Sequence, residues 1–169
     1  DYSPNGLEHE RAAVSRMLAA LESVPIVDET DEITALELRR TGELSRDRLD
    51  AGVDLAEVNN IETPAHTVRM IFDLMPQQSV EDFAAIAERL RNVSAALTGY
   101  TLREGVARRI VPARRQVREL AAQSEEYARA GGFFSDLIAG VPESAPESLR
   151  RDLAEGAAEA QEAYGGLSL

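Results

Sequence analysis

The chain has 169 residues, of which 44% are hydrophobic, so it is long and apolar enough for one ordinary domain and is not a disordered acidic tail. Its net charge of −12 argues against binding to nucleic acid or to an anionic membrane, because both would repel it at long range. It has no cysteine, which excludes disulfides and thiol chemistry, and no apolar run approaches the roughly 18 residues of a membrane-spanning helix.

The first third of the chain predicts two long helices. Ala, Leu, Glu and Arg are abundant, and apolar residues recur at helical spacing over about residues 6–23 and 28–51. Pro25 ends the first helix, and Gly52 stands where the second would have its C-cap. The polar segment 53–63 that follows is the longest stretch without helical periodicity.

The rest of the chain predicts shorter helices. Thr63 is an N-cap candidate followed by proline at the first helical position, and Ser79 is the N-cap candidate of the next helix. Helices are expected over about residues 64–75, 79–97, 111–130, 133–138 and 146–164, with 100–110 either continuing a helix or forming a short one. No strand is credible and most connections are short. We therefore predict an all-α fold, an antiparallel multi-helix bundle of about six to eight helices.

Neither histidine completes a catalytic or metal-binding motif. His9-Glu10 begins like the zinc-protease helix motif, but the residue four positions after His9 is Ala13, and one side chain cannot hold zinc. The carboxylate pairs lie in polar helical segments without the burial that shifts a catalytic pKa. The chain by itself therefore has no complete catalytic site, and we expect no metal in it.

A polar cluster surrounds the start of the helix at Pro64: Asn59, Asn60, Thr63, His66 and Arg69. Polar groups at a loop–helix junction often bind ligands, so a substrate-contact role is one interpretation. The other is that His66 is simply hydrogen-bonded to the preceding loop.

An arginine-rich stretch raises the hypothesis of nucleic-acid binding. Its members are Arg103, Arg108, Arg109, Arg114, Arg115 and Arg118. The stretch has no interleaved aromatic residues for base stacking, and the net charge opposes the hypothesis, so solvated helix faces explain it better.

Several segments, taken together, resemble one protein family. They are Asn59-Asn60-Ile61, Ile71-Phe72-Asp73-Leu74-Met75-Pro76, Arg89-Leu90, Ala95-Ala96-Leu97, Gly99-Tyr100, Leu102-Arg103-Glu104-Gly105, Pro112-Ala113-Arg114-Arg115-Gln116-Val117 and Ala160-Gln161-Glu162-Ala163-Tyr164. Their order and spacing, from about Leu7 to Leu167, are similar to the N-terminal half of the bacterial DUF885 family.

This resemblance implies a mostly helical parent protein several hundred residues long, similar to helical zinc metallopeptidases with a deep channel. The zinc motif and a later glutamate-containing segment would lie in the C-terminal half, so zinc would belong to the full-length parent and not to this chain. Residues 1–169 would then be a non-catalytic N-terminal portion that forms a wall or lid of the channel. Its candidate substrate-path residues are Asn59, Asn60, Thr63, His66 and Arg69.

Expectations for partners follow from the same resemblance. The missing C-terminal half is the expected partner, and apolar faces left uncovered without it would favour a homo-oligomer. We expect no nucleic acid, no membrane and a cytoplasmic location. The alternative is a single self-contained helical domain over 1–169 that acts as a protein-interaction module without enzymatic activity. A fully covered core would favour this alternative, and exposed apolar surface would count against it.

Overall fold

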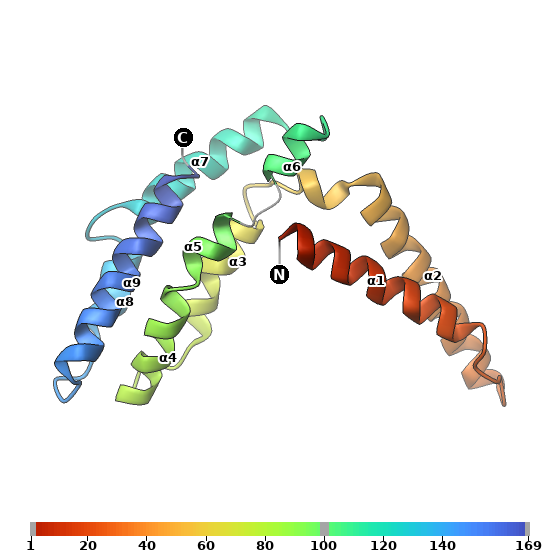
Figure 1. Cartoon of the computed structure of the whole chain (residues 1–169), viewed down its shortest axis with the longest axis horizontal. Helices are drawn as coiled ribbons and strands as arrows, with labels where there is room; N and C mark the ends of the chain where they lie inside the picture. Colours follow the sequence, from red (N-terminus) through yellow and green to blue (C-terminus); the bar gives the residue numbers. More distant parts are fainter. Residues whose placement is uncertain (1–2, 99–101, 168–169) are drawn as a thin grey trace. The chain divides into compact units, whose positions relative to one another are not determined.

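The computed structural model describes residues 3–98 and 102–167, and all the regular structure within them is helical. The helices are α1 (Pro4–Leu21), α2 (Glu29–Ala51), the 3-10 turn η1 (Val53–Ala56), α3 (Pro64–Met70), the 3-10 turn η2 (Ile71–Leu74), α4 (Val80–Leu90), α5 (Val93–Thr98), α6 (Leu102–Ala107), α7 (Arg114–Ala128), α8 (Phe133–Ala139) and α9 (Glu147–Gly165) (Figure 1). In these described ranges, seven α-helices have seven or more residues, and α5 and α6 have six each. The predicted all-α, multi-helix fold is confirmed.

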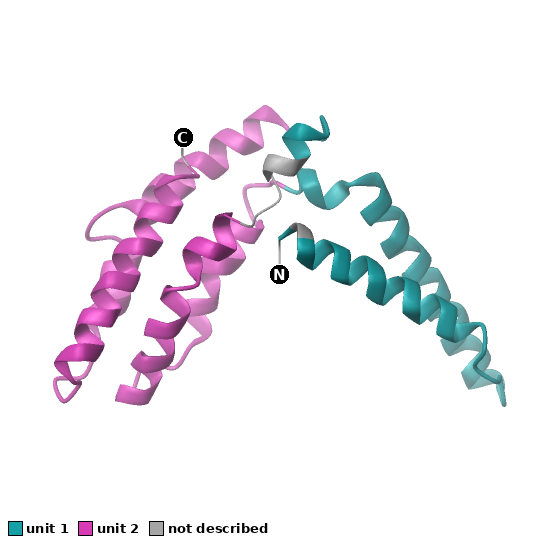
Figure 2. Ribbon diagram, viewed as in Figure 1, with its two compact units in different colours: residues 1–57, 101–111 teal, residues 58–100, 112–169 magenta. Residues whose placement is uncertain are grey.

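The chain folds into two compact units, which Figure 2 shows in different colours. Unit 1 comprises residues 1–57 and 101–111, and unit 2 comprises 58–100 and 112–169. Each unit is therefore built from segments that are separated along the chain. The expectation of one helical domain, or of the N-terminal portion of a longer protein, stays a prediction.

Unit 1 is a helical hairpin of α1 and α2, extended by η1 and α6. Asp28 caps α2 by accepting a hydrogen bond from the Asp31 N–H at 2.9 Å. Gly52 ends α2 in the left-handed conformation, with φ of 69°, as its position in the sequence predicts. Among the described residues, Leu49 and Leu55 are the buried hydrophobic side chains of this unit. Its core is therefore small.

Unit 2 has a larger core, built around α9. This helix packs against α4, α5, α7 and α8. The largest fully buried side chains come from these helices and from η2: Phe72, Phe83, Ile86, Leu90, Phe134, Leu153 and Tyr164. The rings of Phe72 and Phe134 meet edge to face at 6.0 Å, and those of Phe134 and Tyr164 lie 5.6 Å apart.

Two helices are shorter than the sequence predicts. The helix expected over 64–75 changes to 3-10 geometry at Ile71. The long helix expected over 79–97 is broken at Arg91 and Asn92, where the Asn92 N–H bonds the Arg89 carbonyl at 3.0 Å. The Asn92 side chain also donates to the Glu88 carbonyl at 2.9 Å, and this competition with the helical pattern explains the break.

In the ranges that the structure describes, no helix is both long and apolar enough to cross a lipid bilayer. Gly99 and Tyr100, which form one of the family-like segments, lie outside the described residues.

Candidate functional site

The polar cluster expected near a substrate path lies in unit 2, where the loop before α3 meets the helix. Thr63 is the N-cap of α3, and its hydroxyl accepts a hydrogen bond from the His66 N–H at 3.4 Å. Pro64 occupies the first helical turn, as predicted. Thr63 and His66 are 2% and 5% exposed, so both side chains belong to the interior of the unit.

His66 is the centre of a chain of hydrogen bonds. Its Nε2 lies 2.8 Å from Gln123 Oε1, and its Nδ1 lies 2.8 Å from the Thr63 hydroxyl. The Gln123 amide nitrogen donates to the Asn60 carbonyl at 3.2 Å, which leaves Gln123 Oε1 as an acceptor. In a neutral imidazole, Nε2 therefore carries the proton and Nδ1 accepts from the Thr63 hydroxyl. Both ring nitrogens are used within the fold.

The two asparagines shape the loop before α3. Asn59 Oδ1 accepts hydrogen bonds from the backbone N–H groups of Ile61 and Glu62, at 2.8 and 2.6 Å. Asn60 takes part through its carbonyl, which accepts from Gln123 of α7. The loop is thus folded on itself by Asn59 and tied to α7 through Asn60.

Arg69 forms the outer part of the cluster. Its guanidinium pairs with Asp73, four residues further on, and lies 4.5 Å from the centre of the Phe133 ring and 5.7 Å from that of Tyr127. The side chain is 20% exposed. Its Nε has no hydrogen-bond partner among the described residues.

Tyr164 packs beneath the cluster. Its hydroxyl donates to the Ala65 carbonyl at 2.7 Å, and its ring meets that of Tyr127 edge to face at 5.3 Å. Burial, more than the neighbouring Tyr127, raises the pKa of Tyr164 well above its usual range. Its hydroxyl therefore stays protonated and can act as a hydrogen-bond donor.

The structure brings four of the five predicted residues, Asn60, Thr63, His66 and Arg69, into one cluster. It joins α3 and the loop before it to α7, α8 and α9, and Asn59 folds that loop. The cluster also includes Gln123, Tyr127, Phe133 and Tyr164, which sequence reasoning did not place there. His66 lies 57 residues from Gln123 along the chain, and Ala65 lies 99 from Tyr164, so no local pattern could pair them. Because both ring nitrogens of His66 are hydrogen-bonded, to Thr63 and to Gln123, the cluster holds α3 and α7 together. A substrate-contact role stays a prediction.

The other histidine, which the sequence analysis rejects as a zinc ligand, is His9. His9 lies on an exposed position of α1. Within the described residues, no group of three or more His, Cys, Asp or Glu side chains could hold a metal ion.

Comparison with known proteins identifies a family for this chain. No curated protein matches the chain. Residues 1–168 match the family described as a bacterial protein of unknown function, DUF885. This match covers nearly the whole chain, in agreement with the ordered segments that resemble the family. The chain therefore belongs to the DUF885 family.

Proposed function

We propose that the chain is a non-catalytic helical segment of a zinc-dependent, peptidase-like hydrolase. Membership of the DUF885 family and the order of the family-like segments support this proposal. In it, unit 1 docks on the part of the parent protein that carries the catalytic site, and unit 2 contributes a wall of the substrate channel. An apolar face of α2 is the observation that carries the proposal.

Helix α2 has apolar residues on two nearly opposite faces. One face packs on α1 and includes Ala35, Gly42 and Leu49. The other carries Ile33, Leu36 and Leu44, which we call the outer row. At about 100° per residue, the members of the outer row fall within one arc, far from the face that packs on α1.

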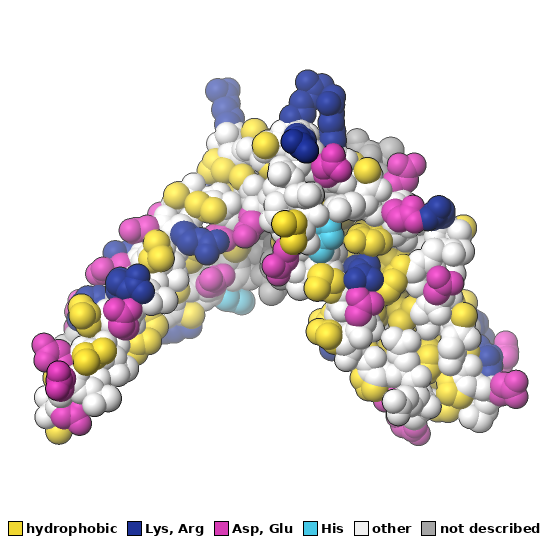
Figure 3. Space-filling model, turned by 180° about the vertical axis from the view of Figure 1, so that it is seen from behind, with side chains coloured by type: hydrophobic (Ala, Val, Ile, Leu, Met, Phe, Trp, Pro, Cys, Tyr) yellow, Lys and Arg dark blue, Asp and Glu magenta, His cyan; other side chains and the backbone are white. Residues whose placement is uncertain are grey.

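The outer row is largely uncovered. Ile33, Leu36 and Leu44 are 56%, 61% and 56% exposed, and Val24, Ile26 and Val27 at the tip of the hairpin are exposed as well. Figure 3 shows hydrophobic side chains at several places along the surface of this hairpin. Fully burying one Leu or Ile side chain is worth roughly 1.5–3 kcal/mol, so covering this row would stabilise a complex substantially.

The cluster around His66 suits a channel wall in unit 2. The hydrogen bonds to Thr63 and Gln123 and the ring contacts of Arg69 hold these polar groups in fixed positions. In the proposal, Asn59, Asn60 and Arg69 lie nearest the substrate path, and the buried Thr63 and His66 hold this part of the wall in place from within. The chemistry is performed by residues of the catalytic part.

The experiment is to determine the intact mass, zinc content and peptide hydrolysis of the protein purified from its source cells. The expected result is a mass several times 18.4 kDa, bound zinc and hydrolysis of peptides. Changing the whole outer row to Glu should then abolish activity. The control Thr34→Glu with Thr41→Glu, at exposed polar positions of the same helix, should leave it unchanged.

The other outcome would favour a self-contained interaction module. A natural protein of about 18.4 kDa would exclude a larger parent enzyme. The outer row would then be the surface that binds a separate protein, and the proposal of a peptidase segment would be wrong.

A further inference from the structure

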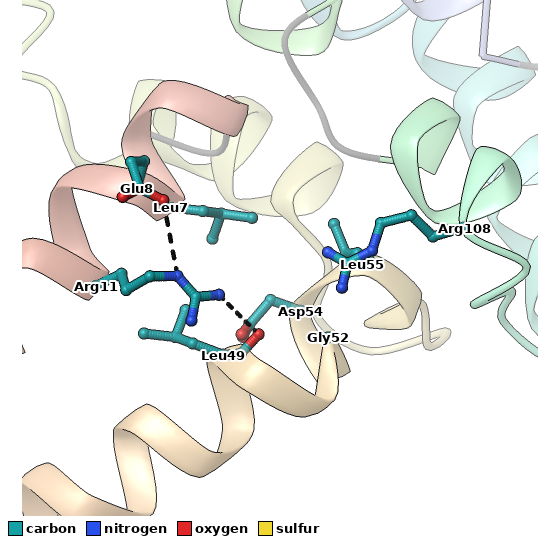
Figure 4. A pocket seen from close by; sticks show the side chains of 8 residues that line it. All are labelled: Leu7, Glu8, Arg11, Leu49, Gly52, Asp54, Leu55 and Arg108. Atoms are coloured by element: carbon teal, nitrogen blue, oxygen red, sulfur yellow. Dashed lines mark hydrogen bonds and ion pairs between the residues drawn. The ribbon is translucent and has the colours of Figure 1, made fainter.

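Unit 1 contains a pocket between α1, the end of α2, η1 and the end of α6. It has a volume of about 140 Å³ (Figure 4). Its lining residues are Leu7, Glu8, Arg11, Leu49, Gly52, Asp54, Leu55 and Arg108. The pocket is thus lined by leucines together with side chains of both charges.

The basic side chains enter from opposite sides. Figure 4 shows the Arg11 guanidinium, from α1, and the guanidinium of Arg108, the residue that follows α6, both reaching into the pocket. Arg11 is fixed by an ion pair with Asp50 and by donation to the Leu49 carbonyl at 3.1 Å. Two guanidinium groups that face one cavity favour a carboxylate between them.

Acidic side chains line the same pocket. Asp54 is held by Arg48, whose Nη2 lies 3.3 Å from Asp54 Oδ1, and its side chain is 24% exposed. Glu8 lies next to Arg11, with 3.7 Å between the Glu8 carboxylate and Arg11 Nε. A ligand with only a negative charge would be repelled by these carboxylates. A ligand that also carries an ammonium group would be attracted.

The backbone at Gly52 leaves room for this arrangement. A Cβ at this position would lie 2.7 Å from Ile110 Cδ1 and 3.9 Å from Arg108 Nη2. The absence of a side chain therefore allows the segment after α6 to approach α2 and brings Arg108 to the pocket.

The size of the pocket limits the ligand. An apolar cavity of about 150 Å³ is known to accept benzene, so a pocket of about 140 Å³ suits a molecule with roughly six to eight heavy atoms. Leu7, Leu49 and Leu55 provide apolar contacts for a short aliphatic group.

We propose that this pocket binds a small zwitterion of the α-amino acid class, such as alanine or valine. The carboxylate lies between Arg108 and Arg11, the ammonium group faces Asp54, and the aliphatic side chain contacts the leucines. This site does not depend on the proposed function, because it involves neither the outer row nor a catalytic part.

The test is calorimetric titration of the full chain with L-alanine and L-valine. Acetate and methylammonium, which each carry only one of the charges, and L-tryptophan, which is too large, serve as comparison ligands. Both small amino acids should bind at least about tenfold more tightly than each comparison ligand, because both charges and the size must match. Equal binding of acetate would show a plain anion site, and no binding of either amino acid would overturn the proposal.

Variants locate the binding in this pocket. Arg108→Gln and Asp54→Asn should each weaken alanine binding about tenfold or more, because each removes one charged partner. Arg46→Gln changes an exposed residue of α2 that does not line the pocket, so this variant should bind alanine as tightly as the unsubstituted chain. Circular dichroism checks that the variants fold. Folded variants that bind alanine as tightly as the unsubstituted chain would contradict the assignment of the binding site to this pocket. The comparison of ligands on the unsubstituted chain tests the proposal without any substitution.

Discussion

Arg109 has a backbone conformation that is unusual for its residue type. Its φ is 60°, in the left-handed region, two residues after the last residue of α6. The Ile110 N–H bonds the Gly105 carbonyl at 2.8 Å, and the Arg109 N–H bonds the Val106 carbonyl at 3.1 Å. This pair of bonds is a Schellman ending, in which the left-handed residue is usually glycine. Arg109 therefore carries backbone strain that a glycine would not.

Arg109→Gly should stabilise the protein by roughly 1 kcal/mol, because a side chain in the left-handed region costs about 1–2 kcal/mol and glycine avoids most of it. Urea unfolding followed by circular dichroism measures the change. The converse substitution, Gly52→Ala, should destabilise, since Gly52 has φ of 69° and its Cβ would crowd Ile110. An Arg109→Gly variant less stable than the parent chain would show that the side chain makes a contact worth more than the strain.

Gln123 shows how one residue can join distant parts of unit 2. It bonds His66 and Asn60 at once, and so ties α7 to the loop before α3. Gln123→Ala should lower the free energy of unfolding by roughly 1–3 kcal/mol, because the buried His66 ring loses its partner at Nε2. Chemical unfolding gives the value. Gln78→Ala, at an exposed position, should stay within about 0.5 kcal/mol, and an equally small change at Gln123 would mean that water replaces its side chain.

At the scale of the element, α4 begins with a capping box. The Ser79 hydroxyl accepts from the Asp82 N–H at 3.1 Å, while the Asp82 carboxylate accepts from the N–H groups of Gln78 and Ser79, both at 2.9 Å. These backbone hydrogen bonds lower the pKa of Asp82 below its ordinary value of 3.8. The start of α4 is therefore stabilised by a group that titrates in acid.

This pKa shift predicts a pH dependence. Since the pKa of Asp82 is lower in the folded chain, the carboxylate stabilises the fold fully above pH 3.8 and loses this effect as the pH falls through the folded pKa. Asp82→Asn should lower the free energy of unfolding at neutral pH. The difference in stability between this variant and the unsubstituted chain should become smaller in acid. Ser79→Ala should instead cost about 1 kcal/mol with no such trend. A deficit of Asp82→Asn that is independent of pH, measured by urea unfolding between pH 7 and acid, would contradict this role.

The contact between α4 and α9 depends on a glycine. A Cβ on Gly156 would lie 2.8 Å from Leu90 Cβ, closer than such atoms approach in proteins. Gly156→Ala should therefore force the two helices apart and lower the free energy of unfolding by roughly 1–3 kcal/mol, although alanine has a higher helix propensity than glycine. Thermal unfolding measures the loss. Gly165→Ala on the same helix, where the Cβ would meet Ala128 Cβ at 3.8 Å, should be neutral or slightly stabilising. Equal effects at both positions would exclude a packing cause.

At the scale of the whole molecule, the two units have unequal interiors. Phe83, Ile86 and Leu90 of α4 are fully buried in unit 2, whereas α1 has no buried residue among its described positions. We predict that the amides of α4 and α9 exchange hydrogen much more slowly than those of α1 and α2, because local opening of a small core costs less free energy. Mass spectrometry of peptides after exchange tests this, and similar protection in both units would mean that they unfold together.

The sequence by itself determined the class of the fold and many helix boundaries. Thr63 with Pro64, Ser79 with its acidic first turn, and Gly52 are local signals, because capping and left-handed turns depend on a few neighbouring residues. The family-like segments, through their order along the chain, likewise indicate the DUF885 family without any tertiary contact.

Only the tertiary structure decided how the polar cluster is built. The bonds from Gln123 to His66 and from Tyr164 to Ala65 join residues 57 and 99 positions apart, and no periodicity or spacing encodes such pairs. The division into two units and the pocket between α1, α2, η1 and α6 also arise from non-local packing. Helical periodicity tells which face of a helix is apolar, but the outer row of α2 shows that it does not tell which apolar face the fold will cover.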